Sequence, residues 1–221
     1  VVQKELGGKV PLIGFCGAPW TLAAYMIEGR TSRGFDRAKA AFFGDEGFAH
    51  ELLSRIAESL TLYLQAQLDA GADALQIFDS WAGALAPADY ARLGAPYIAR
   101  VVKALKRPRQ QPVIVFGVET GELLAQLAST GADVVGVDWR VPLDEARRRV
   151  GPAVALQGNL DPASLLLPPA QLEKRVASVL EEARRARTGH IFNLGHGILP
   201  STPVENARLT VELVHRGSPA R

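Results

Sequence analysis

The sequence predicts an α/β fold, a (β/α)8 TIM barrel that lacks about its first two strands. Short apolar runs alternate with longer amphipathic stretches about six times along the 221 residues. The apolar runs are continuous, as expected for the strands of a parallel sheet that is covered by helices. Nearly every run ends in glycine or polar residues, as the ligand-binding face of such a barrel requires.

The first third of the chain sets the pattern. Residues 1–8 resemble the last turns of a helix, because they end in two glycines typical of a C-cap. An apolar run over 10–16 predicts the first strand, and a proline and a threonine after it indicate a helix reaching about residue 29. Residues 34–47 have a mixed pattern and predict no element. Apolar residues at helical spacing then predict a long helix over 48–70.

The remaining chain repeats strand and helix in turn. Further strands are predicted over 74–78, 112–116, 134–137 and 153–157, and around residue 191. Further helices are predicted over 87–106, before 129, and over 143–150, 168–187 and 203–216. Arginines in the last turn of the helix over 143–150 interact favourably with its dipole. The tripeptide Gly-Ala-Asp precedes two of the strands, at 71–73 and 131–133, and indicates a repeated unit.

Two sheet architectures are compatible with this alternation, the closed barrel and the open doubly wound sheet. The open sheet is disfavoured because no strand is followed by Gly-x-Gly-x-x-Gly; Gly14-Phe15-Cys16-Gly17 continues with alanine and proline instead. A closed barrel needs eight strands, and the deficit lies at the N-terminus, where the chain begins within an element. No linker or composition shift divides the chain. We therefore expect one N-terminally truncated barrel domain over residues 1–221.

Composition excludes several classes of protein. Apolar residues make up 48% of the chain and charged residues 22%, an ordinary globular balance. The net charge of +2, without a basic run interleaved with aromatics, gives no reason to expect nucleic acid. The single cysteine, Cys16, excludes an intrachain disulfide framework and fits a reducing compartment. No apolar run is long enough to span a membrane and no signal peptide opens the chain, so the expected location is cytoplasmic.

Three polar side chains near strand ends are candidates for substrate contact. His196 lies between two glycines after an apolar run, where a sharp turn could present it to a ligand. Ser80 could donate to a carboxylate, or it could cap the following helix. Tyr25 lies in the helix after the first strand, where its hydroxyl could bind a ligand or a structural carbonyl.

Other polar residues at strand ends have structural alternatives. Asp79, Glu119 and Asp138 end three strands, so they could form a carboxylate pair for glycoside hydrolysis, or they could satisfy loops. Asn159 and Asp161 flank a turn and are explained by Asx-turn chemistry. The four histidines lack ligand spacing and no second cysteine is present, so no metal site is expected.

Six motifs resemble the uroporphyrinogen decarboxylase family, in its order and at plausible spacing. These are Val10-Pro11-Leu12-Ile13-Gly14-Phe15-Cys16-Gly17-Ala18-Pro19-Trp20-Thr21-Leu22, Tyr25-Met26-Ile27-Glu28-Gly29, Ile77-Phe78-Asp79-Ser80-Trp81-Ala82-Gly83, Gly136-Val137-Asp138-Trp139, Leu156-Gln157-Gly158-Asn159-Leu160-Asp161-Pro162 and Phe192-Asn193-Leu194-Gly195-His196-Gly197. The resemblance covers essentially the whole chain.

The resemblance implies a single-domain (β/α)8 barrel, usually a homodimer, that acts in haem synthesis without cofactor or metal. Members of the family remove the four acetate carboxyl groups of uroporphyrinogen III to give coproporphyrinogen III. Carried over by motif, Tyr25, Ser80 and His196 correspond to substrate-contacting residues, and Phe15 and Phe78 to apolar residues that line the cleft.

The chain departs from the family pattern at its beginning. The family's Arg-Gln-Ala-Gly-Arg motif and its Phe-Ser-Asp segment, whose aspartate is catalytic, precede the portion represented here, upstream of Val1. The chain thus resembles the later three-quarters of the enzyme. No catalytic residue is assigned within it, no arginine cluster is expected at its strand ends, and it is expected to be inactive alone.

Two other functions are considered. Corrinoid methyltransferases of the same barrel superfamily need thiolate ligands for zinc, whereas the strand over 112–116 is followed by Gly117-Val118-Glu119 without cysteine. A non-catalytic chain that binds a tetrapyrrole, or that only packs with a partner, is the third possibility.

Overall fold

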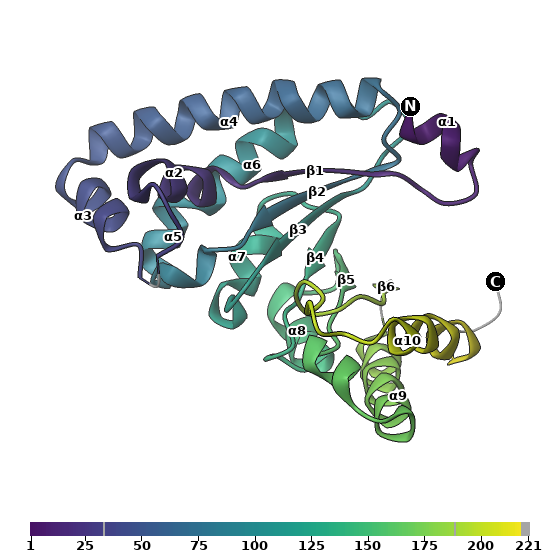
Figure 1. Ribbon diagram of the computed structural model, residues 1–221. Coiled ribbons are helices and arrows are strands. Elements are labelled where there is room, and N and C mark those ends of the chain that lie inside the picture. Colours follow the sequence, from purple (N-terminus) through teal and green to yellow (C-terminus); the bar gives the residue numbers. More distant parts are fainter. Residues whose placement is uncertain (33, 188, 218–221) are drawn as a thin grey trace.

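In the described part of the chain, the sheet has six parallel strands in sequence order. The computed structural model describes residues 1–32, 34–187 and 189–217 (Figure 1). The strands are β1 (Ile13–Gly17), β2 (Ala74–Asp79), β3 (Val113–Gly117), β4 (Val134–Gly136), β5 (Ala155–Gln157) and β6 (His190–Ile191). Each pairs in parallel with the next, in the order β1-β2-β3-β4-β5-β6. A doubly wound sheet would reverse this order near its middle, so the strand order is that of a barrel, as predicted.

Helices form the layer outside the sheet. They are α1 (Val2–Leu6), α2 (Pro19–Glu28), α3 (Asp36–Gly44), α4 (Glu46–Asp69), α5 (Pro87–Leu93), α6 (Ala95–Ala104), α7 (Leu124–Ser129), α8 (Leu143–Val150), α9 (Pro169–Ala186) and α10 (Val204–Gly217), with short 3-10 helices η1 (Ala82–Ala84), η2 (Gly121–Leu123) and η3 (Pro162–Leu166). Seven of these helices form a series in which each packs against the next, in the order α2, α4, α6, α7, α8, α9 and α10 (Figure 1). None of the described helices is long and apolar enough to cross a membrane.

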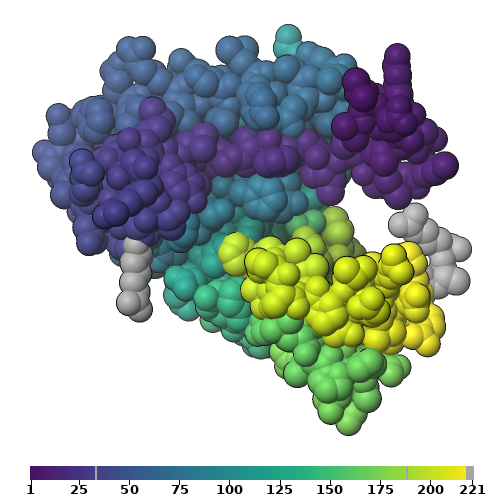
Figure 2. All heavy atoms as spheres, viewed as in Figure 1, coloured from purple at the N-terminus to yellow at the C-terminus, as the bar shows by residue number. Residues whose placement is uncertain are grey.

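The sheet is an open arc in the described part of the chain. There, β1 pairs only with β2, and β6 pairs only with β5. In the space-filling view, the first strand forms a purple band above the yellow C-terminal segment (Figure 2). The six strands therefore provide one continuous wall whose carboxyl ends share one edge.

The repeated Gly-Ala-Asp has the same structural role at both positions. Gly71 and Gly131 have positive φ angles of 102° and 83°, which let the chain turn from helix into strand. Asp73 accepts a hydrogen bond from the backbone N–H of Leu12 at 2.9 Å, and Asp133 accepts one from Val113 at 2.8 Å. Each aspartate thus ties the start of its own strand to the start of the preceding one.

Two local expectations need correction. Residues 34–47, for which no element was predicted, contain α3, whose buried Phe42 packs edge-on against Trp20. The helix predicted over 87–106 is two helices, α5 and α6, divided at Gly94. A Cβ at Gly94 would lie 2.2 Å from the Tyr90 ring, and proline near the start of α6 cannot donate to a continuous helix.

Candidate functional site

A cavity of about 460 Å³ opens at the carboxyl ends of the strands. Its wall combines the ends of β2 and β3 with the loop after β6. The lining residues are Gln76, Phe78, Ser80, Phe116, Asn193, Leu194, His196, Gly197 and Ile198. Gln76 is buried and accepts a 3.4 Å hydrogen bond from Gln157 across the interior of the sheet. The structure thus brings together three predicted site residues, Phe78, Ser80 and His196.

A row of rings crosses this face of the sheet. Phe15 contacts Phe78 edge-on with centroids 5.9 Å apart, and Phe78 contacts Phe116 at 6.1 Å. The His196 ring lies nearly parallel to the rings of Phe116 and Trp139, at 6.4 and 6.3 Å. We call these five residues the aromatic row. Phe15 is 61% exposed and contacts Phe78, but it is not among the described residues that line this cavity.

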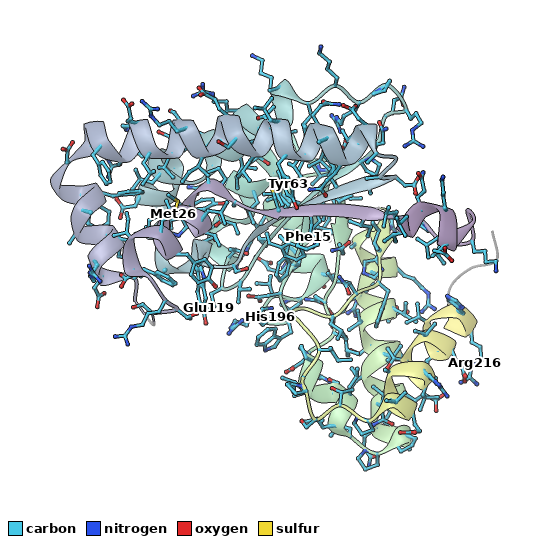
Figure 3. The ribbon with its side chains drawn as sticks, turned by 45° about the horizontal axis from the view of Figure 1, so that its top comes forward. Phe15, Met26, Tyr63, Glu119, His196 and Arg216 are labelled. Atoms are coloured by element: carbon cyan, nitrogen blue, oxygen red, sulfur yellow. The ribbon has the colours of Figure 1, made fainter. Side chains whose placement is uncertain are left out.

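Glycines in neighbouring strands and loops make room for the aromatic row. A Cβ at Gly136 would lie 2.8 Å from the Phe116 ring, so the side chain of Phe116 fits only because β4 has no side chain there. A Cβ at Gly195 would lie 2.5 Å from the backbone nitrogen of Trp139. Gly195 therefore lets the loop that carries His196, which Figure 3 labels, approach the end of β4 closely.

The side-chain hydroxyls of Ser80 and Tyr25 have no hydrogen-bond partner among the described residues. The 3-10 helix after Ser80 has no side-chain cap, so the capping alternative for Ser80 is not observed. Tyr25 is 38% exposed, and its ring packs edge-on against Phe35 and Trp81 at 6.2 and 6.0 Å. Tyr25 does not line the cavity itself but contacts the residue next to Ser80. A second hollow of about 770 Å³ also borders Ser80 and Trp81.

Asp79 is a buried support and does not face the cavity. It is fully buried and accepts hydrogen bonds from the hydroxyls of Thr21 at 2.7 Å and Tyr90 at 2.9 Å. Burial raises the pKa of Asp79 to about 6 although both hydrogen bonds lower it. Thr21 also accepts from the backbone N–H of Trp81 at 3.2 Å. Asp79 therefore satisfies neighbouring groups within the fold, which was the alternative to a role in a carboxylate pair.

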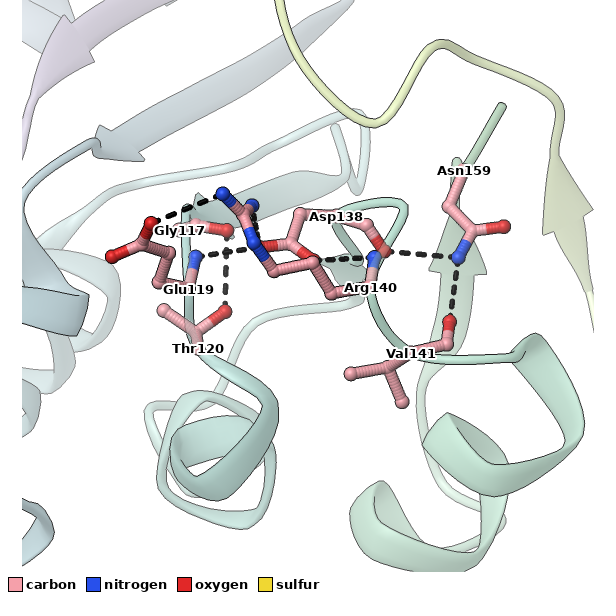
Figure 4. Close-up of polar contacts among 7 residues, drawn as sticks. All are labelled: Gly117, Glu119, Thr120, Asp138, Arg140, Val141 and Asn159. Carbon is pink, nitrogen blue, oxygen red and sulfur yellow. Dashed lines mark hydrogen bonds and ion pairs between the residues drawn. The ribbon is translucent and has the colours of Figure 1, made fainter. Parts of the chain in front are cut away.

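Glu119 and Asp138 flank the guanidinium of Arg140 (Figure 4). Asp138 is buried and accepts from the backbone N–H of Glu119 at 2.5 Å, from the backbone N–H of Arg140 at 2.9 Å, and from its Nη1 at 3.1 Å. Arg140 Nη2 donates to Glu119 at 3.0 Å, and its guanidinium lies 4.1 Å above the centre of the Trp139 ring. We call Glu119, Asp138 and Arg140 the Arg140 cluster. Its carboxylates surround a cation and do not form a catalytic pair.

The two residues explained by Asx-turn chemistry behave differently. Asp161 accepts from the backbone N–H of Ala163 at 2.9 Å and caps η3, as expected. Asn159 instead donates to the carbonyls of Asp138 at 2.9 Å and Val141 at 2.6 Å, so the Asx-turn explanation is wrong for it (Figure 4). Asn159 thereby supports the loop that carries Arg140.

Sequence reasoning missed Phe116, Trp139 and Arg140 as site residues. Each lies at or just after a strand end. Ser80 and His196 were chosen as candidates by that same position, so it could also have identified these three residues.

Burial raises the pKa of the Cys16 thiol to about 12, which keeps it protonated. Within residues 1–32, 34–187 and 189–217, no group of three histidine, cysteine or acidic side chains could hold a metal ion.

Comparisons with known proteins identify the family. The model of the family "Uroporphyrinogen decarboxylase (URO-D)" matches residues 1–217. The chain is 53% identical to the uroporphyrinogen decarboxylase of Frankia casuarinae over 95% of its own length, and 51% identical to that of Myxococcus xanthus over 97%. It spans 56% and 61% of the length of these two relatives.

A solved structure, a methyltransferase from Methanosarcina mazei, shares the fold with a TM-score of 0.84. It is 18% identical in sequence, and the match covers 97% of this chain and 61% of that one. At this identity the likeness concerns the fold alone. On the family model and the two sequence relatives, the chain belongs to the uroporphyrinogen decarboxylase family.

Proposed function

We propose that the protein carrying this chain removes the four acetate carboxyl groups of uroporphyrinogen III and releases coproporphyrinogen III. The observation that carries the proposal is the cavity at the strand ends, where Ser80 and His196 lie beside the rings of Phe78 and Phe116. The family relationship supplies the substrate class.

The substrate has a broad, largely apolar macrocycle with carboxylates at its rim, and the cavity has matching chemistry. Phe15, Phe78 and Phe116 offer an apolar surface against which pyrrole rings can pack. Ser80 and His196 lie on the same cavity wall and can donate to substrate carboxylates. Tyr25, which packs on Trp81 beside Ser80, is assigned a further contact with the substrate.

Decarboxylation requires a place for the electrons of the breaking C–C bond. Protonation of the electron-rich pyrrole beside each acetate makes the ring a cationic electron sink. The bond pair moves into that ring as carbon dioxide leaves, which gives an exocyclic methylene group. Addition of a proton to this methylene carbon and loss of the proton first added to the ring then give the methyl group and restore the pyrrole. The residues of this chain hold the macrocycle and orient the acetate, which reduces the entropic cost of reaching that geometry. No residue of this chain is assigned as the catalytic group.

The test is an anaerobic assay of the protein expressed at the full length that its gene encodes. Uroporphyrinogen III is supplied, and products are oxidised to porphyrins and separated by their number of carboxylates. Stepwise appearance of species with seven, six, five and four carboxylates is expected. Tight binding without loss of carbon dioxide would support the non-catalytic alternative. If the protein neither binds nor converts uroporphyrinogen III, the proposal is refuted.

The homodimer and the cytoplasmic location are part of the same proposal. The homodimer rests on the family resemblance, and the cytoplasmic location rests on the single cysteine, which fits a reducing compartment. Sedimentation of the purified protein tests the first, and fractionation of the source cells tests the second. A monomer with full turnover would separate the oligomeric proposal from the catalytic one.

A further inference from the structure

We propose that Arg140 binds a carboxylate of the substrate, and that the carboxylate of Glu119 occupies this binding position in the free protein. This inference rests on the proposed function, because it names the residue that neutralises part of a polycarboxylate ligand. None of the described residues that line the cavity is a lysine or an arginine. Arg140 is the cation that the structure joins to the aromatic row, through Trp139.

Arg140 is held in a fixed position from one side. Buried Asp138 accepts from both its backbone nitrogen and its Nη1, and the face of the guanidinium lies on the Trp139 ring. Asp138 is itself fixed by the backbone N–H of Glu119, and its carbonyl accepts from Asn159. A guanidinium held in this way loses little further freedom when it binds an anion.

The other side of Arg140 remains available. Its side chain is 40% exposed, and the contacts with Asp138 and Glu119 use two of its five N–H groups. Guanidinium groups bind carboxylates with two parallel hydrogen bonds, so Arg140 has enough donors for an incoming carboxylate.

The carboxylate of Glu119 is held only weakly at its position beside Arg140. Its side chain is 61% exposed, and its described ion pair is the one with Arg140 at 3.0 Å. Exposed ion pairs of this kind contribute little to stability, because water solvates both charges well. The backbone of Glu119 is held by Asp138 with a positive φ of 59°, so its side chain can move away while the loop stays in place. A substrate carboxylate can therefore take its place on Arg140.

The position of Arg140 suits a ligand with a broad apolar core and a charged rim. Trp139 has Arg140 on its ring face, and the His196 ring lies nearly parallel to it at 6.3 Å. His196 in turn lines the cavity with Phe116 and Phe78. A macrocycle packed along the aromatic row would thus meet a cation where the row ends, beyond His196.

The experiment measures binding of two porphyrins by titration, with the protein expressed at the full length that its gene encodes. Uroporphyrin carries eight carboxylates, and coproporphyrin carries four and lacks the acetates. Arg140→Met is expected to weaken uroporphyrin binding by about tenfold or more, the usual effect of losing a charged hydrogen bond. Arg140→Lys keeps the charge but not the planar guanidinium, so its affinity for uroporphyrin is expected to lie between those of the unaltered protein and Arg140→Met. Glu119→Gln is expected to tighten binding by about two- to fivefold, because it removes the competing anion.

Arg148→Met is the matched control, since Arg148 is a 69% exposed arginine of α8 whose described ion pair is with Glu145. It is expected to bind uroporphyrin like the unaltered protein. Thermal unfolding checks that each variant is folded, and Arg140→Lys tests the role if Arg140→Met does not fold. Unchanged uroporphyrin affinity in a folded Arg140 variant would overturn the inference while leaving the proposed function intact. Weaker binding in Glu119→Gln would overturn the part assigned to Glu119. No porphyrin binding and no turnover by the unaltered protein would overturn the proposed function, and this inference with it.

Discussion

The hydroxyl of Thr21 donates a 2.7 Å hydrogen bond to the fully buried carboxylate of Asp79. This bond joins helix α2, which carries Tyr25, to the end of strand β2, which is followed by Ser80. Two further bonds tighten the same junction, from Trp81 to Thr21 through the backbone N–H and from the Trp20 indole to the Trp81 carbonyl at 2.9 Å. The two proposed substrate-contacting hydroxyls thus stand on elements that are fixed to one another.

Asp79→Asn is expected to remove a pH dependence of stability. The pKa of Asp79 is 3.8 in its ordinary state and about 6 in the folded protein, because burial penalises its charge. Between these values the folded state keeps a proton that the unfolded state has lost, so this contribution to stability is full below about pH 3.8 and falls as pH rises to about 6. The free energy of unfolding of the unaltered protein should fall relative to Asp79→Asn by about 2 kcal/mol from pH 4 to pH 7.

Urea unfolding at half-unit pH intervals measures this difference. Asp69→Asn, at an exposed position of α4, controls for removal of a negative charge. A constant difference between the unaltered protein and Asp79→Asn across the range would show that Asp79 does not titrate there.

Tyr25→Phe is expected to reduce activity without reducing stability. The Tyr25 hydroxyl has no hydrogen-bond partner among the described residues, and the ring contacts with Phe35 and Trp81 remain in phenylalanine. Loss of one substrate hydrogen bond should raise the barrier for kcat/KM by about 0.5–1.5 kcal/mol, while the free energy of unfolding changes by less than about 0.5 kcal/mol. Steady-state kinetics and thermal unfolding check both effects, with the protein expressed at the full length that its gene encodes. Full turnover with a lower melting temperature would assign Tyr25 a structural role.

The sequence was sufficient for the fold because the signals involved are local. Continuous apolar runs, glycine caps and helical spacing predicted all six strands and most of the helices. The exceptions depended on contacts across the fold. Residues of α3 form a helix around Phe42, which packs on Trp20, and the break at Gly94 is explained by the Tyr90 ring. Neither contact is visible in a short stretch of sequence.

The candidate site was predictable in part for the same reason. Ser80 and His196 could be selected because each follows a strand, and parallel strands bring such residues to one edge. Asp79 has a structural role because α2 and α5 bury its carboxylate and donate hydrogen bonds to it, whereas the carboxylate of Glu119 faces outward. The role of Asn159 depends on the carbonyls of another loop. Such partnerships arise only when distant segments pack.

His196→Ala is expected to lower kcat/KM for uroporphyrinogen by about tenfold or more, as loss of a hydrogen bond to a charged carboxylate implies. His196 is exposed and makes offset ring contacts with Phe116 and Trp139, so the free energy of unfolding should fall by no more than about 1 kcal/mol. Kinetics and urea unfolding test the two effects separately. His196→Gln, which retains a donor, should recover part of the rate, and unchanged kcat/KM in both variants would remove His196 from the site.

The two glycines beside His196 make a matched pair for the last prediction. A Cβ at Gly195 would lie 2.5 Å from the backbone nitrogen of Trp139, whereas a Cβ at Gly197 would meet nothing within 4 Å. Gly195→Ala must therefore push the loop away from the end of β4, at a cost of about 1–3 kcal/mol in stability, and should shift His196 away from Phe116 and Trp139. Gly197→Ala should leave stability equal or slightly higher, because alanine restricts the unfolded chain.

Unfolding free energies and kcat/KM of the two variants separate close backbone approach from general loop flexibility. If approach matters, Gly195→Ala loses both stability and activity while Gly197→Ala keeps its stability. Equal losses in the two variants would mean that flexibility of the loop, rather than its contact with the end of β4, determines where His196 lies.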